Sequence, residues 1–456
     1  MGSTRLTRAR ELGQHGIALL LGHSIPICLV LAVGLASKRT IWPFANALLV
    51  IPLVSMTVTA HEASHAFAGI LLGMRPSRVA LGFGPKLFEI AIKSCRIQVH
   101  AVLNGGMTVL ANEAQLSWVR LRFWLTVAAG PAFNLLLLML LLPLHARHES
   151  RGLAIGWAPV QVAWFVALFA AAYTLIPFRS FSSSGDIRND LWLLLAVPFW
   201  REEQVAELKT SALLERAAAF ERQKRFDEAF ACFDQALAQV PNSYGARLAR
   251  AALLIRRGQL EQGRKDTVAL LTCKEPWPAY RLGALNNIAW ADLLLDRPEL
   301  VEEAARYSSE VVIAQSRVSP YQGTRGLCLV TLGDWEEGMA ALRYAFGTNL
   351  EAENRALNAC SLALGLMRVG KPADARQWIE TARSLDSSCL LLARAEGEVE
   401  GRVPCPEPIP RKLRVSLARE HQAAAERARE RQHARAQVYW AAVFVGTLAV
   451  LKFIFG

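Results

Sequence analysis

The segment HEASH places His61, Glu62 and His65 inside one of the most apolar stretches of the chain. On a helix, His61 and His65 lie one turn apart on the same face, so both imidazoles can bind one zinc ion. Glu62 is turned about 100° from His61, so its carboxylate can contact a zinc-bound water without being a ligand. Zinc lowers the pKa of that water toward about 7, and the carboxylate can accept its proton. This residue set predicts the hydrolysis of a peptide bond.

The alternative interpretation is that these side chains lie idle in water at the end of a membrane helix. Ionisable residues inside apolar segments are costly, and they usually have a function. A catalytic zinc ion also needs a third protein ligand. The segment 173–191 supplies two candidates, Asp186 and Asp190, at the end of a later apolar segment.

Composition indicates a membrane part joined to a polar part. The chain has 456 residues, of which 53% are hydrophobic, and a mean hydropathy of +0.23, which is high for a soluble protein and low for a pure membrane bundle. A helix needs about 20 apolar residues to span a bilayer. Five segments meet this requirement, namely residues 16–36, 41–73, 121–144, 153–178 and 437–455.

The distribution of basic residues predicts the orientation. Arginine and lysine are frequent before the first segment, in the connector 74–120 and in the stretch 411–436. With five crossings these regions share one side, so the N-terminus, the connector and residues 179–436 are predicted to be cytosolic. The net charge of +12 is explained in this way, and no nucleic-acid recognition motif accompanies it. The eight cysteines form no CxxC pair, which favours reduced thiols over a disulfide framework.

The connector contains a predicted β-hairpin at residues 87–103. Apolar residues alternate with polar ones on both sides of a turn near Lys93 and Ser94, and a glycine-rich turn at 82–85 precedes them.

Residues 205–400 are predicted to form helical repeats. Small residues recur at intervals of 34, 41, 34 and 37, and in the first unit further residues follow the spacing of the second helix of a tetratricopeptide repeat. Such repeats stack to bury a shared core and usually present a surface to a protein partner. The recurring small residues are Ala229, Gly263, Ala304, Gly338 and Ala375.

A basic helical linker, 405–436, leads from the repeats to the last apolar segment.

Residues 1–200 resemble the site-2 proteases, a family of zinc metalloproteases that cleave within membranes. HEASHAFAG (61–69) corresponds to the family's HExxH motif, and GPAFN (130–134) matches its GxxxN helix. LGFGPKLF (81–88) and NGGM (104–107) resemble the glycine turns around its membrane-associated hairpin. The IPF and SGD residues of segment 173–191 occupy the place of its aspartate motif.

The resemblance implies a role for each matching residue. His61, His65 and Asp186 hold Zn2+, Glu62 is the general base, and Gly130 and Asn134 support the site. The family usually has Leu-Asp-Gly where this chain has Ser-Gly-Asp, so Asp190 remains the alternative third ligand. The hairpin could pair with an unwound substrate strand.

The predicted fold class is mostly α: a polytopic membrane helix bundle with a small β-hairpin, followed by a cytosolic α-solenoid. The predicted function is zinc-dependent cleavage of single-span membrane proteins, with a protein partner at the repeats. The predicted location is a cell membrane, and alanine and arginine usage favours a bacterial one. A catalytically inactive membrane-anchored scaffold is the alternative. A proton-coupled transporter is disfavoured because no inverted repeat is visible.

Overall fold

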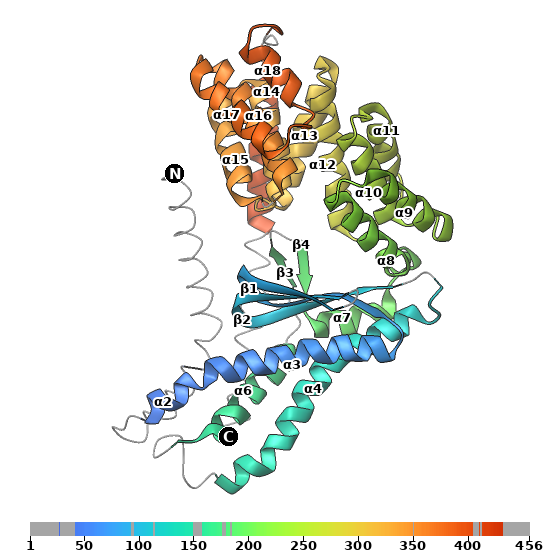
Figure 1. Ribbon diagram of the computed structural model, residues 1–456, viewed down its shortest axis with the longest axis vertical. Helices are drawn as coiled ribbons and strands as arrows, with labels where there is room; N and C mark the ends of the chain where they lie inside the picture. The colour runs from blue at the N-terminus through green and yellow to red at the C-terminus, as the bar shows by residue number, and fades with distance from the viewer. Residues whose placement is uncertain are drawn as a thin grey trace. The chain divides into compact units, whose positions relative to one another are not determined.

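The computed structural model describes residues 42–92, 95–112, 115–148, 157–175, 179–182, 185–349, 351–404 and 413–431, together with Ile27 and Pro410. It divides into two compact units (Figure 1). The first contains Met1–Ser180 and Asp186–Ala246, and the second contains Phe181–Gly185 and Arg247–Gly456.

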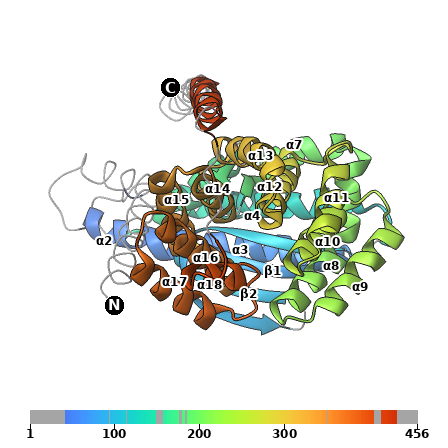
Figure 2. The same cartoon turned by 90° about the horizontal axis from the view of Figure 1, so that it is seen from above.

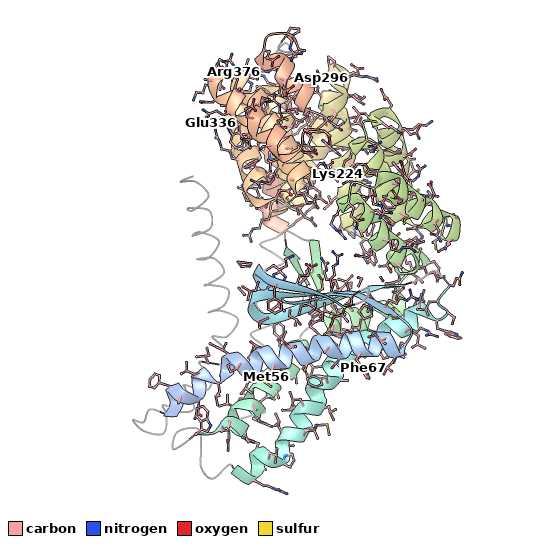
Figure 3. All side chains as sticks on the ribbon, in the orientation of Figure 1. Met56, Phe67, Lys224, Asp296, Glu336 and Arg376 are labelled. Carbon is pink, nitrogen blue, oxygen red and sulfur yellow. The ribbon has the colours of Figure 1, made fainter. Side chains whose placement is uncertain are left out.

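The first unit contains three long apolar helices that pack against one another: α3 (Val50–Leu71), α4 (Val119–His148) and α6 (Pro159–Thr174). The short helix α2 (Trp42–Leu48) precedes α3, and α7 (Asp190–Ala196) continues into the 3-10 turn η2 (Val197–Phe199). Apolar side chains such as Met56 and Phe67 are exposed on α3, at 67% and 63% (Figure 3). A surface of this kind suits lipid better than water.

Two segments in the described part of the chain are long and apolar enough to cross a membrane, Phe44–Leu71 and Val119–Arg147. They correspond to the predicted spans 41–73 and 121–144. The predicted span 153–178 is represented by α6, which has 16 residues and is shorter than the usual membrane helix. The spans 16–36, except Ile27, and 437–455 lie outside the described residues. A bundle of five spans therefore stays a prediction.

The predicted hairpin is present and longer than expected. Strand β1 (Arg75–Ile92) pairs antiparallel with β2 (Cys95–Ala111). Residues 75–81 pair with 106–111, and residues 78–81 also pair with 96–99. Residues 86–92 pair with 95–100. Both strands pack on α3 (Figures 1 and 2). The turn residues Lys93 and Ser94 lie outside the described part. At the glycine turn predicted at 82–85, Gly82 has a φ of +85° and the pairing shifts register between Leu81 and Lys86, so β1 is interrupted there as predicted.

A small sheet of β3 (Arg179–Ser182) and β4 (Gly185–Arg188) lies between α6 and α7 in the sequence. Asp186 belongs to β4, and its side chain is outside the described set. Asn189 follows β4 and begins α7, because its side-chain Oδ1 accepts a hydrogen bond from the backbone N–H of Trp192 at 3.2 Å.

The predicted repeats are helix pairs in which each second helix carries one of the recurring small residues. Ala229, Ala304 and Ala375 are fully buried. A Cβ atom on Gly263 would lie 2.6 Å from Ile255 Cγ1, so the small residue allows the two helices of a pair to touch. The helices are α8 (Glu202–Arg222), α9 (Phe226–Gln239), α10 (Tyr244–Arg256), α11 (Leu260–Leu270), α12 (Pro278–Leu295), α13 (Val301–Ala314), α14 (Ser319–Leu332), α15 (Trp335–Thr348), α16 (Ala352–Arg368), α17 (Pro372–Leu385) and α18 (Leu392–Val399), with the 3-10 turn η3 (Pro298–Leu300) before α13.

Part of the predicted basic linker packs on the second unit. Residues 413–431 are helical, and Leu417 is only 7% exposed within the core of the repeats. Ser309 Oγ lies 2.5 Å from His421 Nδ1, and burial together with the nearby Arg325 lowers the pKa of this histidine. The linker is therefore a docked element over this stretch and not a free spacer.

Candidate metal centre

Three potential metal ligands converge at the start of α7. His61 Nε2 lies 2.8 Å from Asp190 Oδ2, His65 Nε2 lies 3.4 Å from the same oxygen, and the two Nε2 atoms are 3.2 Å apart. A tetrahedral zinc ion with bonds of about 2.0–2.1 Å separates neighbouring ligand atoms by about 3.3 Å. The three side chains are 9–20% exposed, so the site is shielded and still accessible. Their spacing fits a single ion, with one position left for a water or substrate oxygen.

A hydrogen bond from α4 sets the orientation of His65. Its Nδ1–H donates to the backbone carbonyl oxygen of Thr126 at 2.8 Å. With the proton held on Nδ1, the Nε2 lone pair points toward His61 and Asp190 and can bind a metal. His61 Nδ1 is buried and has no hydrogen-bond partner among the described atoms. The Nε2 atoms of both rings therefore face the candidate site.

Gly130 allows α4 to come this close to α3. A Cβ atom at this position would lie 2.4 Å from His65 Nε2 and 2.6 Å from His61 Cε1. Real Cβ atoms do not approach other atoms so closely, so any side chain at position 130 would displace the imidazoles. The glycine of the GPAFN motif thus packs directly against both histidines.

Asn134 lies one turn further along α4. Its side chain is 2% exposed, and its Nδ2 donates to the carbonyl oxygen of Ala170 on α6 at 3.5 Å. Its Oδ1 is buried and has no partner within the described residues. Asn134 therefore links α4 to α6, and its supporting role at the site stays a prediction.

Glu62 lies between α3 and β2. Its side chain is buried, with 6% exposed, and its Oε2 accepts a hydrogen bond from the Thr108 hydroxyl at 2.7 Å. A Cβ atom on Gly106 would lie 2.4 Å from Glu62 Cγ, so the β2 backbone packs against this side chain. The strand holds the carboxylate beside the two histidines that flank it in the sequence.

The structure places Asp190 beside the histidines. Helix α7 is held on α4 because the Trp124 indole N–H donates to the Leu194 carbonyl oxygen at 2.9 Å. This contact brings the first residue of α7 to the candidate metal ligands of α3. Among the described residues, the carboxylate that contacts both histidines is that of Asp190, the alternative candidate. The side chain of Asp186 is outside the described set, so its assignment as third ligand stays a prediction.

Residues 49–378 match the model of the family described as Peptidase family M50, which covers more than two thirds of the chain. The chain belongs to this family. Its members are membrane-associated metalloproteases, and the matched range includes Glu62 and all three candidate ligands. The resemblance to site-2 proteases is therefore confirmed.

No curated protein matches the chain. Among solved structures, a thermophilic TPR protein from Thermus thermophilus is 20% identical, with a TM-score of 0.33. That comparison covers 42% of this chain and 99% of the other.

Thr108 and Gly106 are the contacts of this M50 peptidase that sequence reasoning missed. Both are close to the NGGM segment, which drew attention as a glycine turn near the hairpin. Gly106 begins the paired segment 106–111 of β2, which packs on α3. Two adjacent glycines inside a strand were the available signal, because glycine there often marks a close approach of another group.

Proposed function

We propose that this chain is a zinc-dependent endopeptidase that hydrolyses peptide bonds of membrane-spanning proteins. The observation that carries the proposal is the convergence of His61, His65 and Asp190, with Glu62 beside them. The two histidines lie on α3, within a segment that is long and apolar enough to cross a membrane. We assign Asp190 as the third ligand.

The chemistry divides between the metal and the side chains. A zinc ion held by the three ligands would polarise the scissile carbonyl and acidify a water molecule. Glu62 accepts the proton of the attacking water and returns a proton to the leaving amine nitrogen. The Thr126 carbonyl keeps His65 in the tautomer that binds metal. Asn134 is positioned to hydrogen-bond a substrate group near the site.

The substrate backbone is proposed to pair with β2 along its edge at residues 106–111. In the described part of the chain these residues pair only with 75–81, so their second edge is free to bind an extended strand. Gly106 packs on Glu62, so a peptide on this edge would pass the general base. The sequence suggested residues 87–103 for this role, but the edge at 106–111 is nearer to Glu62. A helical substrate must unwind first, because its backbone groups are already hydrogen-bonded.

The family match and the distribution of basic residues support a proposed location, and the repeats support a proposed partner. We propose a multi-pass protein of a cell membrane, with its N-terminus and repeats in the cytosol. The substrates are proposed to be single-span membrane proteins, and the repeats bind a protein that selects or regulates them.

The decisive experiment compares the wild type with Glu62→Gln, both purified in detergent. Zinc is quantified, and cleavage of a model transmembrane substrate is followed. We expect about one zinc per chain in both proteins and a loss of at least about a hundredfold in kcat for Glu62→Gln. Absence of zinc together with equal behaviour of the two proteins would favour the inactive scaffold and overturn the proposal.

The third ligand is tested with Asp190→Ala and Asp186→Ala, which make the same change four residues apart. We expect Asp190→Ala to lose zinc and Asp186→Ala to retain it. The reverse result would restore Asp186 as the ligand.

A further inference from the structure

One face of β2 packs on α3 through alternate residues. Gly106 contacts Glu62, Thr108 hydrogen-bonds Glu62, and Leu110 Cδ2 lies 3.1 Å from the Cβ position of Gly69. Residues two apart on a strand point to the same side, so this face is aligned with α3. The Thr108 hydroxyl is the polar group that this face presents to Glu62.

The Thr108 hydroxyl contacts Glu62 at two points. It lies 2.7 Å from the carboxylate Oε2 and 3.2 Å from the backbone carbonyl oxygen of the same residue. Gly106 closes the other side of the Glu62 side chain, where a Cβ would lie 2.7 Å from Oε1. The carboxylate is thus held between a donor and a backbone surface.

A fixed carboxylate matters because glutamate is a flexible side chain. Ordering such a side chain costs up to about 2 kcal/mol of rotamer entropy. A displacement of about 1 Å in a catalytic group can lower a rate by about a hundredfold. Because the hydrogen bond from Thr108 to Glu62 forms before the substrate binds, the rotamer entropy of Glu62 is already lost when the reaction begins.

We propose that Thr108 is a positioning residue that fixes the Glu62 carboxylate beside His61 and His65. The inference rests on the proposed function, since it assigns Glu62 the role of general base. Thr108 acts through Glu62 and does not itself contact the reacting atoms. A purely structural strand position would be served equally well by valine, which has the same shape and packs well in half-buried strands.

The test compares Thr108→Val, which removes the hydroxyl, with Thr108→Ser, which retains it. For each we measure kcat, KM, zinc content and the unfolding temperature of the full chain in detergent. We expect Thr108→Val to lower kcat by about tenfold or more, with KM within about twofold and zinc at about one per chain. We expect Thr108→Ser to restore most of kcat.

Thr57→Val is the matched control. It makes the same change on α3, where the Thr57 hydroxyl donates to the Leu53 carbonyl oxygen of its own helix at 2.8 Å, so kcat should not change. If Thr108→Val binds less zinc than the wild type, Thr108→Ala is measured as well. Its kcat, calculated per zinc-loaded molecule, should be lower than that of the wild type by about tenfold or more.

The outcomes separate this inference from the proposed function. Equal kcat for the wild type and Thr108→Val, or equal losses in the valine and serine variants, would overturn the positioning role. A further loss of kcat when Thr108→Val is added to Glu62→Gln would also contradict it, because residues that act as a unit are not additive. If Glu62→Gln itself is fully active, the proposed function fails before Thr108 is considered.

Discussion

The candidate metal centre depends on the lack of a side chain at one position as well as on the candidate ligands. His61 and His65 can approach α4 only because position 130 carries no Cβ atom. The GPAFN motif therefore belongs to the same structural requirement as HEASH, although 65 residues separate Gly130 from His65 in the sequence. Substitution of the glycine should therefore disturb the metal ligands directly.

We predict that Gly130→Ala lowers zinc content well below one per chain. The added methyl group would lie 2.4 Å from His65 Nε2 and displace the ligand that it touches. Zinc is measured on the purified protein. The control is Gly347→Ala in α15, where a Cβ meets no atom within 4 Å and the change should stabilise the helix by about 0.5–1 kcal/mol. Full zinc occupancy in Gly130→Ala would show that α4 can move away.

The buried carboxyl group of Asp292 should make the stability of the repeats depend on pH. Burial raises the pKa of Asp292 to about 6 from its ordinary value of 3.8, although Arg264 hydrogen-bonds the carboxylate and opposes the shift. The folded state thus binds the proton more tightly than the unfolded state does. The stability from this group is fully present below pH 3.8 and is lost as the pH rises through about 6.

Asp292→Asn should flatten this dependence, because asparagine stays neutral throughout. The affected free energy of unfolding is at most about 3 kcal/mol. Unfolding temperatures of the wild type and the variant between about pH 4 and pH 7 provide the measurement. An unchanged slope in the variant would contradict the assignment.

The sequence predicted the residues of the site that are close neighbours along the chain. His61, Glu62 and His65 share two turns of one helix, so helical periodicity alone fixes which of them lie on one face. Asp190 and Thr108 reach the site through the packing of α7 on α4 and of β2 on α3. No local pattern contains that information, which is why Thr108 was missed.

At the scale of elements, α8 joins the repeats to the strand that contacts Glu62. The backbone N–H of Asn112, the residue after β2, donates to Ser211 Oγ of α8 at 2.8 Å. The backbone N–H of Ala212 donates to the Asn112 carbonyl oxygen at 3.2 Å. Glu202, at the start of α8, pairs with Arg120 of α4 at 3.0 Å. The first repeat helix is therefore part of the first unit.

We predict that Ser211→Ala destabilises this junction. Asn112 is 1% exposed, so the loss of the acceptor leaves a buried N–H without a partner at a cost of about 1–3 kcal/mol. The unfolding temperature should fall while zinc content is retained. Ser384→Ala is the control, since the exposed Ser384 hydroxyl bonds only within its own helix among the described residues. Equal effects of the two changes would show that the junction contributes nothing.

Local patterns predicted element types better than their extents. Alternation indicated two strands, and the structure adds residues 75–86 and 104–111, where glycines interrupt the pattern. The small residues of the repeats indicated helix pairs correctly, because each fills a crossing point between two helices. The attachment of α8 to β2 left no periodic signal, since it depends on single backbone hydrogen bonds.

At the scale of the whole molecule, the structural boundary differs from the change in sequence composition. The composition changes near residue 205, whereas the first unit extends to Ala246. A small core of Leu213 of α8, Ala236 of α9 and Ala246 at the start of α10 lies within that unit. The Thr210 hydroxyl also lies 3.1 Å from Ser243 Oγ.

We therefore predict different behaviour for two truncated chains. A chain of residues 1–256 keeps α8, α9 and α10, and it should fold and retain about one zinc. A chain of residues 1–200 keeps the same three candidate ligands but loses the hydrogen bonds of Asn112 to α8. It should unfold at a lower temperature and bind less zinc. Zinc content and unfolding temperature of both chains in detergent provide the measurement. If the shorter chain equals the longer one in both, the first repeat pair is dispensable for the metal centre, and the coupling of α8 to β2 has no role in forming it.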